Sequence, residues 1–357
     1  MRRVTRRSFM RLGLPLLALA AGCEARAGER IAFFHGNDVY VVQVDGSGLT
    51  RLTHGKAGQP SWSPDGKRLL FHAGVAGPGS GNGGIFAVNA NGSGLTRLVA
   101  GFALAVHPQW SPDGRQIAFV GQRTIDGNPD IYVMHADGSN QRNVTNDPAA
   151  ELYGVFPAPT ANPWSPDGTH LGFSRGVPDA AGAIKSTDIY VIAVDGSGAR
   201  RLTHNPEGVL AYFAGWTPSG SAVLALNGVH LQGTGVGLAL VGLDGSGDQS
   251  LHDLPVLDVP SWSPDGRRMA FFGVSSEGVT GLYVAEADGS GLHAVSSGNC
   301  DGLMGHAWSP DSLQIAYVRG CTNPREESEL WAIYADGAGN RRVTDQPALF
   351  PAWSPAG

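Results

Sequence analysis

Apolar residues gather along the chain in short stretches of about five residues, bounded by turn-forming residues. Residues 116–120 (Gln-Ile-Ala-Phe-Val) and 130–134 (Asp-Ile-Tyr-Val-Met) are two examples. A shorter stretch, Arg-Leu-Thr at residues 201–203, recurs in related form elsewhere. β-Branched and aromatic residues in stretches of this length favour β-strands. The pattern therefore predicts many short antiparallel strands.

A tryptophan motif divides the chain into units. Four of its seven copies read Trp-Ser-Pro-Asp-Gly in full, and the spacings between tryptophans are 48, 54, 52, 46, 46 and 45 residues. Serine, proline and glycine at the first, second and fourth positions favour a type I turn. The seven tryptophans are Trp62, Trp110, Trp164, Trp216, Trp262, Trp308 and Trp353. Because they recur in every unit, we expect them to pack between units as core residues.

A second marker, Asp-Gly-Ser-Gly or a close variant, alternates with the first and also occurs seven times, beginning with residues 45–48. Asp-Gly supplies the positive-φ pair of a tight primed hairpin, so we expect such a hairpin at each copy. Two turns and the strands around them give four antiparallel strands in a unit of about 47 residues, the size of one propeller blade.

The two ends of the chain complement each other. Residues 31–33 begin the repeat at its second strand, and residues 353–357 stop after the first strand of another copy. Six whole units and one unit shared between the ends predict an all-β fold, a closed β-propeller of seven four-stranded antiparallel blades. A shared blade leaves no open sheet edge at the side of the ring.

These motifs resemble the WD-like Pro-Asp repeats of TolB-like propellers, over about residues 29–357. The resemblance implies a propeller fold and an extracytoplasmic role, with the Tol–Pal complex of the cell envelope as the family's setting. Two features differ from the family pattern. No α/β domain precedes the repeats here, and seven tryptophan markers stand where TolB has six blades.

Composition agrees with a turn-rich β protein. The 357 residues include 52 Gly and 23 Pro but only 16% charged residues, which argues against helical bundles and dinucleotide-binding folds with long helices. The net charge is −6. Five arginines fall in the first 23 residues, and without that segment 20 basic residues face 31 acidic ones. The repeats show no basic face, so nucleic acid is not expected as a partner.

The first 22 residues have the pattern of a signal peptide. A basic start with Arg6 and Arg7 resembles a twin-arginine export signal, and the apolar run 12–21 is too short to span a bilayer. Ala-Ala-Gly-Cys ending at Cys23 resembles a lipobox, which implies lipidation of that cysteine. An ordinary cleaved secretory peptide is the alternative. We expect a signal over 1–22, a linker over 23–28 and one propeller domain over 29–357.

Two cysteines remain after Cys23. Cys300 and Cys321 lie equally far on either side of a Ser-Pro-Asp turn and so reach the same open end of the hairpin. Export permits a disulfide, which we expect, although two free thiols are the alternative.

Residues just before each tryptophan begin the innermost strands and are the candidates for lining the channel. They mix aromatic rings, two histidines and one acid, which suits a peptide or a small polar ligand, although they could simply plug the channel. Long loops on the face opposite the two turns are the other candidate binding region. The channel candidates are His107, Tyr212, Phe213, Asp258, Met304, His306 and Phe350.

Catalytic signatures are weak. Gly172–Gly176 fits a nucleophile elbow around Ser174, but it falls at the end of a predicted strand, where the elbow's strand-to-helix turn cannot form. The eleven histidines show no His-x-His or His-Glu-x-x-His spacing, and a channel metal site with His107 and His306 is kept only as an alternative.

The sequence thus predicts a monomeric, lipid-anchored propeller without cofactor. We expect it to bind a protein or peptide segment at its variable-loop face. The expected location is the cell envelope: the periplasm, the outer membrane or the outer face of the cell membrane. The competing hypothesis is a hydrolase or lyase acting on a glycan or peptide in the channel. A purely structural scaffold is the third.

Overall fold

The computed structural model describes residues 29–55, 57–73, 84–124, 127–146, 161–179, 184–229, 236–244, 248–298, 301–320 and 328–355. Within these ranges the secondary structure is entirely β, and no helix there has the length and apolar character that a bilayer crossing requires. The signal segment, Cys23, Cys300 and Cys321 lie outside the described residues. Lipidation and the disulfide therefore stay predictions.

Four sheets have four antiparallel strands each, as the repeat predicted. Their strand orders are β27-β1-β2-β3, β4-β5-β6-β7, β11-β10-β9-β8 and β23-β24-β25-β26. The strands are β1 (Arg30–His35), β2 (Asp38–Gln43), β3 (Thr50–Arg51), β4 (Ser61–Trp62), β5 (Arg68–Ala73), β6 (Gly84–Asn89), β7 (Thr96–Arg97), β8 (Leu104–Trp110), β9 (Gln116–Gln122), β10 (Asp130–His135), β11 (Arg142–Asn143), β23 (Asp301–Trp308), β24 (Gln314–Arg319), β25 (Glu329–Tyr334), β26 (Arg341–Pro347) and β27 (Leu349–Trp353).

The remaining strands form one continuous sheet of eleven. Single residue pairs, Thr187 with Leu210 and Val256 with Gly273, join three antiparallel groups: β12–β14, β15–β18 and β19–β22. The strands are β12 (His170–Pro178), β13 (Ile184–Ala193), β14 (Arg200–Arg201), β15 (Val209–Trp216), β16 (Ala222–Val229), β17 (Val236–Gly242), β18 (Asp248–Val256), β19 (Ser261–Trp262), β20 (Arg268–Val274), β21 (Thr280–Glu286) and β22 (His293–Ser297).

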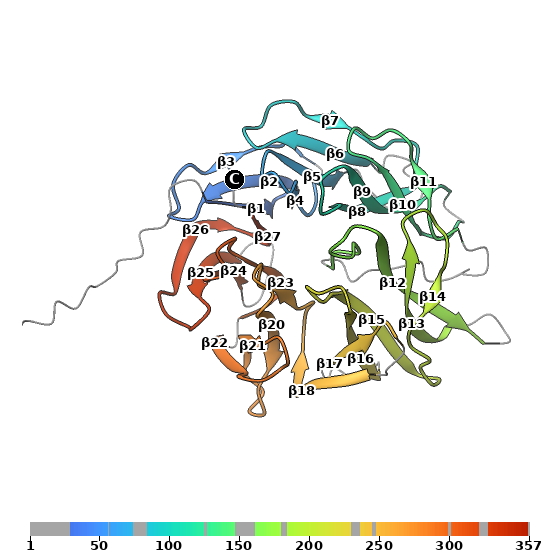
Figure 1. Ribbon diagram of the computed structural model, residues 1–357. Helices are drawn as coiled ribbons and strands as arrows, with labels where there is room; N and C mark the ends of the chain where they lie inside the picture. The colour runs from blue at the N-terminus through green and yellow to red at the C-terminus, as the bar shows by residue number, and fades with distance from the viewer. Residues whose placement is uncertain are drawn as a thin grey trace, which may run out of the picture.

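The two ends of the chain share one sheet. Strand β27 pairs with β1 through Trp353 with Ile31 and Ala352 with Ala32, and Figure 1 shows the sheets arranged around a common centre. None of the described sheets closes on itself. The all-β class and the four-stranded antiparallel sheets are confirmed, whereas a closed ring of seven blades stays a prediction.

The core lies between neighbouring sheets. Each of seven clusters of buried apolar residues in the described chain combines two consecutive strand groups, and one of them joins the last group to the first. Six of the seven repeat tryptophans are buried in these clusters, and Trp262 packs against one of them. The expected packing of the tryptophans between units is confirmed.

Four of these tryptophans also bond between units. The indole Nε1 of Trp164 donates to the carbonyl of Gln109 at 3.1 Å, and that of Trp216 donates to Pro163 at 2.8 Å. Trp62 and Trp308 make the equivalent bonds, each to the residue preceding the previous unit's tryptophan. The repeat thus sets both the packing and the polar contacts between sheets.

The Ser-Pro-Asp-Gly turns form as expected. In the first copy, the Gly66 amide donates to the Ser63 carbonyl at 2.8 Å, and the Ser63 hydroxyl donates to Asp65 at 2.6 Å. At the equivalent Asp167, hydrogen bonds from serine and threonine groups lower the carboxyl pKa to about 2. These turns are therefore held by their own side chains.

The Asp-Gly-Ser turns differ from the expected primed hairpins. Gly46 has φ +86°, but Asp45 is not among the residues with positive φ. The Gly46 amide donates to the Gln43 carbonyl at 2.8 Å, and the Gln43 amide donates to Ser47 at 2.9 Å. This is a type I turn closed by a left-handed glycine. The primed-turn prediction was wrong because the loop is one residue longer than Asp-Gly alone suggests.

Both kinds of turn lie on one face of the molecule, called here the short-turn face. The Ala90 amide, in the second kind of turn, donates to the Lys67 carbonyl in the first kind at 2.8 Å. The turns also meet from unit to unit, since a Cβ on Gly114 would lie 3.5 Å from Pro64 and one on Gly168 would lie 3.6 Å from Pro112.

Candidate channel site

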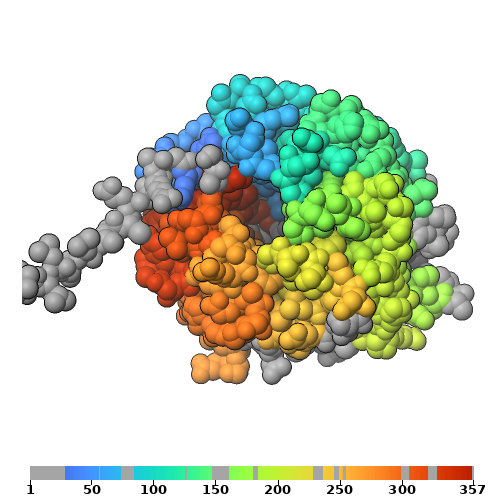
Figure 2. Space-filling view, viewed as in Figure 1, coloured from blue at the N-terminus to red at the C-terminus, as the bar shows by residue number. Residues whose placement is uncertain are grey.

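The innermost strands surround a cavity of about 880 Å³. Figure 2 shows the surface hollowed at the centre of the arrangement. About half of the lining residues are aromatic or prolyl. The polar groups of the wall include the Ser61 hydroxyl, which lies 3.0 Å from the side-chain oxygen of Gln109. Lining rings come from Trp62, Trp262, Trp308, Trp353, Pro60 and Pro260.

One histidine–aspartate pair lies in this wall. His306 Nδ1 lies 2.9 Å from Asp258 Oδ2, and its Nε2 lies 2.9 Å from the Ala270 carbonyl. The other oxygen of Asp258 accepts the Phe272 amide at 2.7 Å. Only 2% of the His306 side chain and 12% of the Asp258 side chain are exposed. Because both ring nitrogens face acceptors, the pair ties two strand groups together and leaves little polar surface for a ligand.

Two aromatic candidates also line the cavity. Tyr212 lies in β15, and burial raises the pKa of its phenol. Phe350 lies in β27 with φ +51°, at an irregularity where the pairing with β1 shifts register. Bulges of this kind redirect side chains, here on an innermost strand beside the channel.

Two of the remaining candidates, Phe213 and His107, fall elsewhere. Phe213 is fully buried between sheets, with its ring 6.5 Å from that of Trp216, so its assignment to the channel was wrong. Side chains alternate across a strand, and the cluster between sheets is the side that Phe213 faces. His107 is not among the residues that line the cavity. The side chain of Met304 lies outside the described residues.

His107 instead contacts a second histidine. Its ring centroid lies 5.7 Å from that of His72, which follows the tryptophan motif of the preceding unit. Burial, together with a smaller contribution from the charge of His107, lowers the pKa of His72 to about 4. The structure therefore does not bring His107 and His306 into one site.

Sequence reasoning did not assign the tryptophans to the channel. Trp262 and Trp353 line the cavity while their buried indole Nε1 atoms have no hydrogen-bond acceptor, and the same holds for the donor of Ser261. Periodicity signals burial equally for every unit, so it could not show which tryptophans also line the cavity.

The two catalytic motifs find no support in the described geometry. Ser174 lies in the middle of β12 and is buried, with its hydroxyl accepting the Phe213 amide at 2.7 Å. Among the described residues, no group of three or more His, Cys, Asp or Glu side chains could hold a metal ion.

Comparison with known proteins fixes the family. The model of the TolB beta propeller domain (PD40) matches residues 108–310, more than half of the chain. The chain belongs to this family. The matched stretch contains five of the seven repeat tryptophans: Trp110, Trp164, Trp216, Trp262 and Trp308.

Individual relatives match a shorter stretch of the chain than the family model does. The Tol-Pal system protein TolB of Anaeromyxobacter dehalogenans (strain 2CP-1 / ATCC BAA-258) is 33% identical over 168 residues, which is 46% of this chain and 37% of that protein. The protein of the same name from Anaeromyxobacter sp. (strain K) aligns over the same length with the same identity. The chain thus aligns with little more than a third of these relatives.

Solved structures support the fold alone. TolB from Acinetobacter baumannii has a TM-score of 0.57 at 15% identity, covering 91% of this chain and 82% of that one. The β-propeller domain of the Trilobed protease from Pyrococcus furiosus has a TM-score of 0.60 at 14% identity and covers 87% of both chains. An oligogalacturonate lyase in complex with manganese has a TM-score of 0.59 at 15% identity, covering 80% and 76%.

Proposed function

We propose that this chain is a non-enzymatic, lipid-anchored propeller of the cell envelope that binds a protein or peptide segment at its channel. In this proposal residues 1–22 direct export, Cys23 carries the lipid, and residues 29–357 form the binding domain. Export and lipidation are supported by the signal-like and lipobox-like sequence. An envelope location is supported by relatives that are named as Tol-Pal system proteins.

The observation that carries the binding role is the composition of the channel wall. A cavity of about 880 Å³ lined by indole, phenol and proline rings is within the usual size range of ligand sites. The rings offer apolar contact, and the Ser61 hydroxyl and the Gln109 side chain add polar groups to the same wall. A peptide segment presents both kinds of group.

The same wall gives less support to catalysis. Its histidine–aspartate pair, His306 with Asp258, is bonded internally through both ring nitrogens and both carboxylate oxygens. A general base needs a nitrogen or oxygen directed at the substrate. A hydrolase or lyase is therefore the second hypothesis, kept because a propeller of similar fold is a lyase.

Photocrosslinking in the native host tests the binding role. A photoreactive phenylalanine analogue at Tyr212, in the cavity wall, should give a discrete adduct with an envelope protein. The same analogue at Tyr283, a half-buried position of β21 outside the cavity wall, is the matched control and should give none. Adducts of equal yield at both positions would show that the channel is not the binding site.

Metal analysis tests the second hypothesis, a hydrolase or lyase, against the binding role. A stoichiometric transition metal in the purified protein, lost in His306→Ala, would favour a lyase or hydrolase in the channel. A protein that is metal-free and crosslinks at Tyr212 would support binding.

A further inference from the structure

Three large apolar side chains stand out as exposed in the described chain. The exposed fractions are 42% for Leu49, 57% for Leu95 and 49% for Leu313. Leu49 and Leu95 directly follow Asp-Gly-Ser-Gly turns or their Asn variant, and Leu313 follows the Ser-Pro-Asp-Ser turn. Exposed apolar residues that gather in one region often mark a contact surface.

All three leucines belong to the short-turn face. Leu313 links the two kinds of turn directly, because its carbonyl accepts the Ala335 amide at 2.9 Å. Their strand groups are neighbours: one buried cluster joins the sheet of β23–β26 to that of β1, and another joins the sheet of β1 to that of β4–β7. The exposed leucines are therefore confined to three adjacent groups of the arrangement.

The chain enters the domain at this same place. The Glu29 carbonyl accepts the Val44 amide at 3.2 Å, beside the turn that precedes Leu49. The Arg30 guanidinium donates to the Gly66 carbonyl at 3.3 Å, in a turn of the next group. The entry point thus lies among the groups that carry the leucines.

The segment before Glu29 is short. Six residue steps separate it from Cys23, and a fully extended chain of that length spans about 20 Å. A lipid on Cys23 would hold the entry point within about that distance of the bilayer interface. This step rests on the lipid anchor proposed above.

We propose that the short-turn face around Leu49, Leu95 and Leu313 docks directly on the membrane surface. The leucines contact the lipid interface, and the opposite face of the propeller points away from the bilayer. The occupant is the lipid surface because the tether and the three apolar side chains coincide at one place.

Two cations on this face lie beside carboxylates. Lys67 lies 3.8 Å from Asp65, and Arg115 lies 3.8 Å from Asp113. Docking should therefore depend on apolar contact more than on anionic lipid, and should change little with salt. This separates it from an electrostatic membrane site.

Two lysines provide an internal comparison. Lys67 is 80% exposed on the short-turn face, and Lys185 is exposed in β13, near the other end of that strand from its Asp-Gly-Ser turn. The full lipidated chain is reconstituted in phosphatidylethanolamine/phosphatidylglycerol vesicles and treated with a water-soluble acylating reagent. Mass spectrometry then gives the rate at each lysine, with the same protein in detergent as reference.

Burial of three half-exposed leucines favours the docked orientation by roughly a hundredfold. We expect vesicles to slow acylation of Lys67 by roughly tenfold or more relative to Lys185. The triple variant Leu49→Ser, Leu95→Ser, Leu313→Ser should remain on the vesicles through Cys23 but lose this protection. These side chains are exposed, so the substitutions leave the core intact.

The outcomes separate the two proposals. Equal rates at Lys67 and Lys185 in vesicle-bound wild-type protein would overturn the docked face while leaving the anchor in place. Protection that survives in the triple variant would also overturn it. Absence of the wild-type chain from host membranes, with Cys23→Ser behaving identically, would overturn the lipid anchor itself.

Discussion

Two units of this protein carry different side chains at one equivalent position of the repeat. In the Asp188 unit, formed by Trp164 and strands β12–β14, a fully buried carboxylate holds the last strand. In the Gly84 unit, formed by strands β4–β7, a glycine occupies the same place in the repeat. The neighbouring strand also differs between the two units. Ser174 of β12, in the Asp188 unit, corresponds to His72 of β5, in the Gly84 unit.

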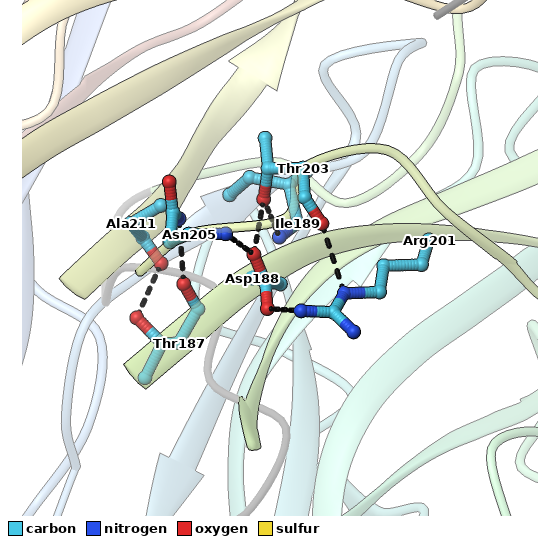
Figure 3. A network of polar contacts seen from close by, with 7 residues as sticks. All are labelled: Thr187, Asp188, Ile189, Arg201, Thr203, Asn205 and Ala211. Carbon is cyan, nitrogen blue, oxygen red and sulfur yellow. Dashed lines mark hydrogen bonds and ion pairs between the residues drawn. The ribbon is translucent and has the colours of Figure 1, made fainter. Parts of the chain in front are cut away.

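The Asp188 unit is tied by a polar network (Figure 3). Asp188 accepts bonds from the Arg201 guanidinium at 2.5 Å, the Thr203 hydroxyl at 2.8 Å and the Asn205 amide at 2.8 Å. The Ile189 amide in turn donates to the Thr203 hydroxyl at 2.9 Å. The carboxylate therefore satisfies the groups that end the strand pair.

The Gly84 unit fills the same space with other atoms. A Cβ on Gly84 would lie 2.8 Å from the Val99 carbonyl and 2.9 Å from Arg97 Nε. Val99 corresponds to Thr203 of the Asp188 unit. The Arg97 guanidinium lies over the Phe86 ring, 5.7 Å from its centroid. The repeat thus fixes the backbone of each unit, while the side chains at one site can change together from polar to apolar.

Removal of the Asp188 carboxylate should have the largest effect on stability. Asp188→Ala should lower the free energy of unfolding by about 4 kcal/mol, because it leaves Arg201, Thr203 and a backbone amide without their shared acceptor. Urea denaturation measures the change. Gly84→Asp, the reverse exchange, should also destabilise the protein, since the pocket there is already filled. A stable Asp188→Ala protein would show that the network is dispensable.

The pH dependence tests the histidine of the Gly84 unit. With its pKa lowered from 6.5 to about 4, His72 is neutral in both states above pH 6.5 and contributes nothing there. Between pH 6.5 and 4 only the unfolded chain takes up the proton, so stability falls by about 3 kcal/mol and then levels off. His72→Phe, which places the ring found at the equivalent Phe272, should reduce this loss. Equal slopes for both proteins would contradict the assignment.

The serine of the Asp188 unit gives a smaller effect. Ser174→Ala removes the acceptor of the buried Phe213 amide and should cost about 2 kcal/mol. Ser174→Thr keeps the oxygen and serves as the control, with a smaller loss expected in urea denaturation. A similar loss in both variants would assign the effect to packing instead of the hydrogen bond.

The tryptophans that pack against the two units give the finest comparison. Trp216 packs on the Asp188 unit and donates to Pro163, whereas Trp110 packs on the Gly84 unit with no acceptor for its buried Nε1. Trp→Phe at both positions loses similar ring area. We expect Trp216→Phe to be less stable than Trp110→Phe by about 1 kcal/mol, the net value of one hydrogen bond. Equal free energies of unfolding for the two variants would contradict a net contribution from the Trp216 hydrogen bond.

Sequence reasoning reached the scaffold because the scaffold repeats. The spacing of Trp62 and its six counterparts gave the strand order and the pairing of the two chain ends, and the Ser-Pro-Asp-Gly turns formed as their residues require. The second turn was assigned the wrong type, since Asp-Gly fits both a primed turn and the last two residues of a longer one. The local sequence does not show how many residues between the two strands remain unpaired.

The channel was predicted only in part. Tyr212, Asp258, His306 and Phe350 line the cavity as expected, but Phe213 faces the core. Adjacent residues of a strand point to opposite sides, so a one-residue uncertainty in a bulged strand exchanges channel for core.

The sequence by itself determined the β class, the four-stranded unit and the turns, because these depend on neighbours along the chain and are repeated in every copy. Tertiary structure alone decided that His306 pairs with Asp258, that Trp262 and Trp353 line the cavity, and that three exposed leucines fall in adjacent strand groups. These arrangements join residues from different units. Their distances follow from how the sheets pack against one another, which no local pattern records.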